Sequence, residues 1–206
     1  MRIIGGRLGG RRLAGLGAAG GGRAHLRPTS DRVREALFNL LAHGDYASPP
    51  PPEGRRVLDL FAGTGALGLE ALSRGAVRAL FVDDLPVARA LIRENVEALG
   101  LTGVTRVWRR NATRLGPCEG APYDLAFLDP PYRSGLAGAA LASARAGGWL
   151  APGAVIVLEL AAGEAPPEAD WLTLANRRRY GDTQILIFTT PESTTPESTT
   201  PEGELP

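Results

Sequence analysis

The chain has 206 residues, 44% of them hydrophobic, and a formal net charge of +1, which is typical of one globular domain with extensions. It has no apolar run of about 18 residues, which excludes a membrane-spanning helix, and its first residues lack the apolar stretch of a signal peptide. A single cysteine, Cys118, excludes an internal disulfide, and two histidines, His25 and His43, are too few for a histidine-based metal site. These features predict a cytoplasmic protein that has no metal and no membrane attachment, and we expect a monomer.

Charge is distributed unevenly along the chain. Residues 1–34 hold eight arginines against one acid, whereas residues 159–206 hold nine acids against three arginines. Every basic residue apart from histidine is arginine, whose planar guanidinium suits phosphates and bases. The basic end therefore indicates an anionic partner, although a GC-rich genome and a solvated helix face are alternative explanations. The candidate phosphate-binding residues are Arg11, Arg12, Arg27, Arg32 and Arg34.

The first 29 residues are rich in glycine and arginine. We expect a flexible basic arm here, with one hairpin formed by segments 2–4 and 11–13. A helix is predicted to follow, because Ser30 offers a capping hydroxyl and apolar residues recur at helical spacing from Val33 to Leu41. Four prolines at 49–52 end this element and form a stiff connector.

Predicted strands and helices alternate over the rest of the domain, residues 30–189. The predicted strands are 56–61, 79–83, 104–108, 123–129, 154–160, 171–180 and 183–189. Helices are predicted after the first, second and fourth of these strands, and they end near Leu72, Leu99 and Arg145. This alternation predicts an α/β fold with a doubly wound, mainly parallel, seven-stranded Rossmann-like sheet and an antiparallel C-terminal hairpin. Residues 190–206 repeat Thr, Pro, Glu and Ser, and we expect a disordered tail.

A glycine-rich loop follows the first core strand. Gly63–Gly68 fits G-x-G-x-x-G, and Asp83 lies 20 residues beyond Gly63, at the predicted end of the next strand. In such loops glycine lets the backbone approach a nucleoside cofactor, and the acid binds a ribose hydroxyl. Asp59 lies inside the preceding strand, where a buried carboxylate needs a partner. The ammonium of S-adenosylmethionine would provide that partner, whereas the pyrophosphate of a dinucleotide would be repelled.

The run 123–128 ends abruptly at Asp129-Pro130-Pro131-Tyr132, because two prolines cannot continue a strand. A carboxylate, the carbonyl of Pro130 and an aromatic ring meet at that point. These groups suit a flat base with an exocyclic amino group, although a rigid turn would also explain them. In an open α/β sheet this position faces the ligand crevice.

Together these motifs resemble class I S-adenosylmethionine-dependent methyltransferases, and more narrowly the bacterial 16S ribosomal RNA guanine-N2 methyltransferase family. The matching segments are 2–6, 26–39, 59–74, 111–112, 129–132 and 180–183, so the resemblance covers nearly all of the chain except the tail. It implies methylation of the exocyclic N2 of a flipped guanine in the small ribosomal subunit or its assembly intermediate, with S-adenosylmethionine as the cofactor. One departure is the run Asp83-Asp84, which leaves the ribose ligand open between these two residues.

The resemblance also implies a set of site residues. The catalytic residues would be Asp129, Pro130 and Tyr132. The Asp129 carboxylate and the Pro130 carbonyl would hold the amino group, and the Tyr132 ring would stack on the base. The cofactor-binding residues would be Asp59, Phe61, Gly63, Thr64, Gly65, Asp83, Asn111, Ala112 and Asp129. The alternatives are an enzyme that methylates adenine N6 or cytosine N4 in RNA or DNA, an NAD-binding oxidoreductase, and an RNA-binding factor without catalysis.

Overall fold

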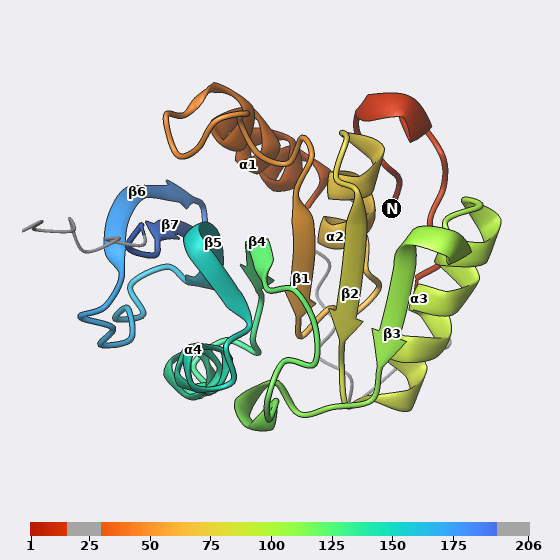
Figure 1. The fold of residues 1–206 in the computed structure, drawn as a ribbon. Helices are drawn as coiled ribbons and strands as arrows, with labels where there is room; N and C mark the ends of the chain where they lie inside the picture. The colour runs from red at the N-terminus through yellow and green to blue at the C-terminus, as the bar shows by residue number, and fades with distance from the viewer. Residues whose placement is uncertain (16–29, 193–206) are drawn as a thin grey trace, which may run out of the picture.

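The computed structural model of the chain describes residues 1–15 and 30–192, and within them seven strands form one sheet (Figure 1). The spatial order is β3-β2-β1-β4-β5-β7-β6. The strands are β1 (Arg56–Leu60), β2 (Arg78–Val82), β3 (Thr105–Trp108), β4 (Tyr123–Leu128), β5 (Leu150–Ala161), β6 (Thr173–Tyr180) and β7 (Thr183–Thr189). Strands β1 to β5 pair in parallel, whereas β7 is antiparallel to both β5 and β6. The predicted fold class is confirmed.

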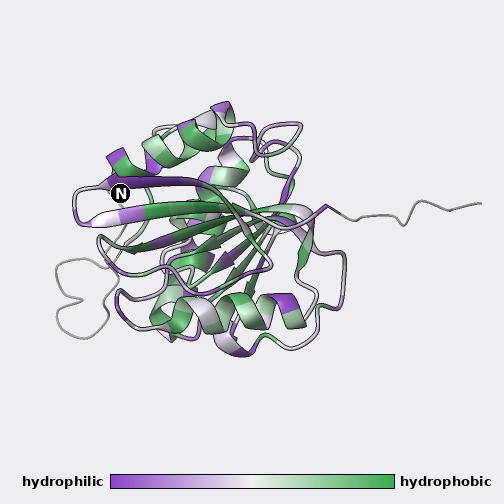
Figure 2. Cartoon of the chain, turned by 90° about the vertical axis from the view of Figure 1, so that its left-hand side faces the viewer, coloured by the Kyte–Doolittle hydropathy of each residue, from purple (hydrophilic) through white to green (hydrophobic). Residues whose placement is uncertain are grey.

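Helices cover both faces of the sheet, and Figure 2 shows them above and below it, coloured partly green for hydrophobic residues. Helices α1 (Asp31–His43), α2 (Ala66–Ser73) and α3 (Pro86–Ala98) contribute to one hydrophobic cluster, and α4 (Leu136–Ala146) contributes to the other. Successive residues of a strand point to opposite faces, so Phe127 belongs to the first cluster and Leu128 to the second. The central strands therefore read as continuous apolar runs.

Helix α1 begins where its capping signal predicts. The Ser30 hydroxyl oxygen accepts a hydrogen bond from the Val33 backbone N–H at 3.3 Å. The helix then buries Leu37, Phe38 and Leu41 against the sheet. The prediction of a helix after Ser30 is thus confirmed, and the helix ends at His43, before Gly44.

The described part of the N-terminal segment packs against the core domain. Segments 2–4 and 11–13 pair as predicted, because Arg2 and Arg12 form an antiparallel bridge and the N–H groups of Ile3 and Leu13 donate to the carbonyls of Arg11 at 2.9 Å and Met1 at 3.1 Å. A short 3-10 helix, Gly6–Leu8, lies between the two segments. Ile3 and Leu13 are buried in the first hydrophobic cluster. The expectation of a flexible arm separate from the domain is therefore wrong for residues 1–15, while residues 16–29 lie outside the described part of the chain.

Backbone hydrogen bonds explain why a glycine-rich segment packs here. Glu70 of α2 is buried, and its carboxylate accepts hydrogen bonds from the N–H groups of Ile4 at 2.7 Å and Gly5 at 2.9 Å. Asn95 of α3 binds Ala14 in the same way, through N–H to Oδ1 at 2.6 Å. Buried polar groups on two helices thus hold both ends of the segment.

None of the helices in residues 1–15 and 30–192 combines the length and hydropathy that a membrane crossing requires. The expected tail is described only as far as Glu192, and its remaining residues lie outside the described part of the chain.

Candidate active site

The strand ends that the sequence singles out lie side by side at one edge of the sheet. Strand pairing ends at Leu60 of β1, Val82 of β2 and Leu128 of β4. The next residues are Phe61, Asp83 and Asp129, which therefore lie in one row. In β5 the same row is occupied by Glu159. Strand order reverses between β1 and β4, and ligands of open α/β sheets bind in the crevice at such a point.

The loop after β1 adopts a backbone that few residues tolerate. Gly63 and Gly65 have φ angles of 56° and 78°, in the left-handed region that favours glycine. Phe61 also has a positive φ, 58°, which is uncommon for an aromatic residue and is often found at ligand sites. The Gly65 N–H closes the turn by donating to the Ala62 carbonyl at 2.7 Å. The loop therefore has the tight, left-handed shape expected of a cofactor cradle.

Asp83 faces this loop, and Asp84 does not. The Asp83 carboxylate accepts hydrogen bonds from the N–H groups of Gly63 and Leu85, both at 2.9 Å, and the residue is buried. Burial raises the pKa of Asp83, against the opposing effect of these two N–H groups. Asp84 is exposed. The geometry favours Asp83 as the ribose ligand.

Asp59 is buried under the loop. Its Oδ2 accepts a hydrogen bond from the Gly68 N–H at 2.9 Å, and burial raises its pKa to about 8, partly opposed by that hydrogen bond. A carboxylate in such a place is stabilised by a nearby cation, so Asp59 fits the ammonium of S-adenosylmethionine. A Cβ at Gly68 would lie 2.4 Å from Phe81 Cε1 and 3.0 Å from Asp59 Oδ2, so only glycine brings α2 this close to β1 and β2.

The Asp129–Tyr132 turn leaves β4 at the same edge. Asp129 is partly buried, and its N–H continues the ladder to the Leu60 carbonyl at 3.4 Å. The Tyr132 hydroxyl donates to Glu159 Oε1 at 2.9 Å and lies 2.7 Å from the hydroxyl oxygen of Thr183. Burial raises the pKa of Tyr132, with a further contribution from Glu159, so the hydroxyl stays protonated and available as a donor.

Glu159 and Thr183 are site residues that sequence reasoning did not assign. Glu159 is buried at the end of β5, and Thr183 begins β7. Their positions follow from the pairing of β5 with β7, which no local motif reveals. Thr183 did belong to one segment of the family resemblance, and Glu159 carried a signal as the one acid within an apolar run, 154–161.

Asn111, Ala112 and Thr64 lie near the same strand ends. Asn111 begins the turn after β3, where its Oδ1 accepts hydrogen bonds from the N–H and the hydroxyl of Thr113, both at 2.8 Å. Its amide nitrogen therefore remains the group suited to a ligand, while Ala112 is buried. The Thr64 carbonyl accepts a hydrogen bond from Asn95 Nδ2 at 3.0 Å, which fixes the loop against α3.

The expected phosphate-binding arginines do not form one set. Arg11, Arg12 and Arg32 are exposed, as phosphate contact requires. Arg34 is fully buried, with Nη2 2.9 Å from Asp31 Oδ1, and burial lowers its pKa. The expectation that Arg34 contacts phosphate is therefore wrong in this fold, and Arg27 lies outside the described residues.

The part of the chain that the structure describes contains no group of three or more His, Cys, Asp or Glu residues arranged to hold a metal ion. The strand-end acids Asp83 and Glu159 accept hydrogen bonds from the Gly63 N–H and the Tyr132 hydroxyl. The arrangement suits a cofactor with ribose and ammonium groups beside a flat, amino-bearing substrate.

Comparison with known proteins gives a consistent result. The family model Conserved hypothetical protein 95 matches residues 1–189. Ribosomal RNA small subunit methyltransferase D of Escherichia coli K12 is 42% identical over 160 residues, which cover 77% of this chain and 74% of that protein. The Haemophilus influenzae protein of the same name is 37% identical over 163 residues, covering 77% and 78% of the two chains.

Solved structures share the architecture. The Escherichia coli protein yhhF superposes with a TM-score of 0.76 at 32% identity, covering 93% of this chain and 98% of that one. An RNA methyltransferase of Salinibacter ruber in complex with S-adenosyl-L-homocysteine has a TM-score of 0.58 at 16% identity, covering 80% and 94%, and shows the likeness of fold alone. From the family model and the 42% identity together, the chain belongs to the family of ribosomal RNA small subunit methyltransferase D.

Proposed function

We propose that this protein transfers a methyl group from S-adenosylmethionine to the exocyclic N2 of a guanine in small-subunit ribosomal RNA. Membership in a methyltransferase family indicates the cofactor and the ribosomal RNA substrate class. The observation that carries the assignment to an exocyclic amino group is the Asp129–Tyr132 turn, which lies one strand away from the glycine loop at the same ends of the parallel strands. The choice of guanine rests on the resemblance to the guanine-N2 methyltransferase family.

Bound S-adenosylmethionine supplies an electrophilic methyl group on a sulfonium. In the proposal, Asp59 binds the ammonium, Asp83 binds the ribose hydroxyls, and the Asn111 amide and Ala112 backbone contact the adenine. Asp59 and Ala112 are buried, and Asp59 also accepts a hydrogen bond from the Gly68 N–H. Asp83 accepts a hydrogen bond from the Gly63 N–H, and Asn111 accepts one from the Thr113 N–H. Phe61, Gly63, Thr64 and Gly65 shape the cradle between them.

Asp129 and the Pro130 carbonyl would accept the two N–H bonds of the guanine amino group. Its nitrogen is a poor nucleophile because the lone pair is delocalised into the ring, and these two acceptors favour a geometry that directs the lone pair toward the methyl carbon. The sulfonium would supply the methyl group and be left as a neutral thioether, and the Asp129 carboxylate, which accepts one N–H, would take up the proton that the nitrogen releases. Most of the rate acceleration would come from orientation and electrostatics.

Tyr132 would stack on the flipped base. Its hydroxyl is held by Glu159 and Thr183, which fixes the ring orientation before the substrate arrives. A base that stacks on an aromatic ring gains on the order of 1–3 kcal/mol. Pre-orientation of the ring reduces the entropy that ordering would cost on binding.

The test is methyl transfer from isotopically labelled S-adenosylmethionine to a transcript of small-subunit rRNA and to purified subunits, followed by digestion to nucleosides. The expected product is N2-methylguanosine, absent with Asp129→Ala although that variant still binds the cofactor. The same acceptors could hold adenine or cytosine, so labelled N6-methyladenosine or N4-methylcytidine would refute the guanine assignment.

A further inference from the structure

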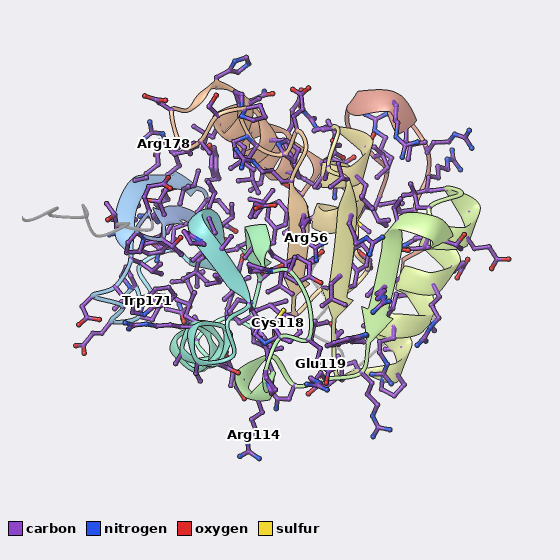
Figure 3. All side chains as sticks on the ribbon, in the orientation of Figure 1. Arg56, Arg114, Cys118, Glu119, Trp171 and Arg178 are labelled. Atoms are coloured by element: carbon purple, nitrogen blue, oxygen red, sulfur yellow. The ribbon has the colours of Figure 1, made fainter. Side chains whose placement is uncertain are left out.

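A groove of about 520 Å³ lies between α1 and β6, outside the site described above. Asn39 and His43 of α1 and Tyr46 of the following loop form one wall, and Arg178 and Tyr180 of β6 form the other. In Figure 3, Arg178 is labelled at the upper left, beside β6 and the segment that follows α1.

The lining of this groove combines the apolar residues Ala36 and Leu40 with polar and aromatic side chains and one arginine. No acid is among its lining residues in the described chain, and Arg178 is exposed. Tyr46 and Tyr180 are partly exposed, and the Tyr46 hydroxyl accepts a hydrogen bond from Asn176 Nδ2 at 2.8 Å, across the groove. Guanidinium, aromatic and amide groups together are the combination that binds phosphates and bases of a single strand.

Arg178 is one of three consecutive exposed arginines on β6, and it is the one that lines the groove. Arg177 binds Gln184 Oε1 through Nε at 3.1 Å and Nη2 at 2.7 Å. Arg178 donates from Nη1 to the Arg177 carbonyl and Arg179 donates from Nε to the Gly181 carbonyl, both at 3.1 Å. Arg178 pairs across the strands with Ile185, which belongs to the core cluster on the α1 side. Side-chain alternation thus directs Arg178 toward α1.

One residue that lines the groove pairs with a residue of the candidate active site. Tyr180, which lines the groove, is the cross-strand partner of Thr183. The Thr183 hydroxyl is 2.7 Å from the Tyr132 hydroxyl at the proposed base-stacking ring. Thr183 and Tyr180 therefore link the Tyr132 ring to the groove, at the end of the β6–β7 hairpin where its turn lies.

We propose that the groove between α1 and β6 binds the RNA strand next to the target base, with Arg178 contacting a phosphate. The proposal rests on the proposed function, because it takes the target base to lie against Tyr132. Once that base is flipped, the adjoining strand must leave the site, and the groove provides a basic, acid-free path beginning at Tyr180. The contact would be made by Arg178 in addition to the exposed Arg32 of α1 and the exposed arginines of the N-terminal segment.

The experiment measures binding of a small-subunit rRNA transcript by Arg178→Ala and Arg178→Lys across a salt series. The matched control is Arg106→Ala, because Arg106 is an exposed arginine on β3, the edge strand at the other end of the sheet. Arg178→Ala is expected to weaken binding about tenfold at low salt and to reduce the slope of log affinity against log salt by about one. Arg178→Lys should retain the slope, and Arg106→Ala should resemble the wild type.

Two further measurements make the test specific. Cofactor affinity and kcat at saturating RNA should be unchanged in Arg178→Ala, because the residue lies outside the reacting groups. A photoreactive nucleotide placed beside the target guanine should crosslink to peptides containing residues 36–46 or 173–180 of the wild type.

Several outcomes would overturn the proposal. These are an unchanged salt slope in Arg178→Ala, an equal loss in Arg106→Ala, or crosslinks confined to other peptides. A loss of affinity seen with assembled subunits and not with the transcript would mean that the groove binds a ribosomal protein instead of RNA. The proposed function fails separately, through the identity of the methylated nucleoside, which this binding experiment does not measure.

Discussion

At the scale of single residues, the ring and the hydroxyl of Tyr132 have different roles, and the sequence motif alone does not distinguish them. The ring is available to stack on a base, while the hydroxyl is engaged by Glu159 and Thr183. The pair of contacts explains why a 37% exposed aromatic residue can hold one orientation.

We predict that Tyr132→Ala lowers kcat/KM for RNA by about 5- to 150-fold, which corresponds to a stacking contribution of about 1–3 kcal/mol. Tyr132→Phe keeps the ring and loses only the hydroxyl contacts, so a smaller decrease is expected. Steady-state kinetics of both variants check this. If phenylalanine and alanine are equally damaging, the hydroxyl is the important group and the stacking role is wrong.

Asp59 predicts a specific dependence of stability on pH. Burial raises its pKa to about 8, so between about pH 4 and pH 8 the folded protein holds a proton that the unfolded chain has lost. The Asp59 contribution to the unfolding free energy therefore decreases as pH rises through this window, by at most about 1.4 kcal/mol per pH unit.

In Asp59→Asn this decrease should disappear, while S-adenosylmethionine binds more weakly because the ammonium loses its counter-ion. Urea unfolding of the cofactor-free protein at pH 5 and pH 8 measures the first effect, and calorimetry measures the second. The control is Asp84→Asn, since Asp84 is exposed. Equal pH dependence in the wild type and Asp59→Asn would show that Asp59 is ionised in the free protein.

At the scale of elements, helix α1 shows what periodicity can and cannot reveal. Arg34 lies at the spacing of the buried residues Leu37, Phe38 and Leu41, so the pattern already placed it on the core face. Its burial with Glu70, 3.8 Å away, could not be foreseen, because Glu70 belongs to another helix and the N-terminal segment completes the cluster. Charge alone therefore misassigned Arg34.

Arg34→Ala is expected to reduce the unfolding free energy by about 3 kcal/mol, because it removes a buried partner of Glu70. This is the low end for a broken buried pair, since Arg74 and two backbone N–H groups still bind that carboxylate. Arg32→Ala, on the exposed face, should change stability by less than about 0.5 kcal/mol and reduce the salt slope of RNA binding by about one. Denaturant unfolding and RNA titrations would contradict this account if the two variants exchanged their effects.

The contact of α2 with the sheet depends on Gly68. In Gly68→Ala the new Cβ would clash with Phe81 and approach Asp59, so we expect a loss of about 1–3 kcal/mol and weaker cofactor binding. Gly103→Ala, in the turn before β3, is the control, because a Cβ at that position would meet no atom within 4 Å. Thermal unfolding with and without S-adenosylmethionine tests the difference, and similar behaviour of the two variants would exclude a packing role for Gly68.

At the scale of the whole molecule, local sequence patterns were sufficient for the sheet and for the order of its main motifs. The strands ending at Asp83 and Asp129 follow from apolar runs with abrupt polar or proline ends. The contacts of Glu159 with Tyr132 and of Glu70 with the N-terminal segment depend instead on strand register and helix placement, which only the folded chain defines. The packing of residues 1–15 was missed because glycine-rich sequence gives no local sign of the acceptors on α2 and α3.

The central claim is that the residues at the carboxyl ends of the parallel strands position a guanine amino group for methylation. Mass mapping of small-subunit rRNA tests it most directly, in cells that lack this protein and in the same cells supplied with the wild type or with Asp129→Ala. The account predicts that one N2-methylguanosine is lost without the protein, is restored by the wild type and is not restored by Asp129→Ala. An unaltered set of N2-methylguanosines, or the loss of a methyl group from a different base, would contradict it.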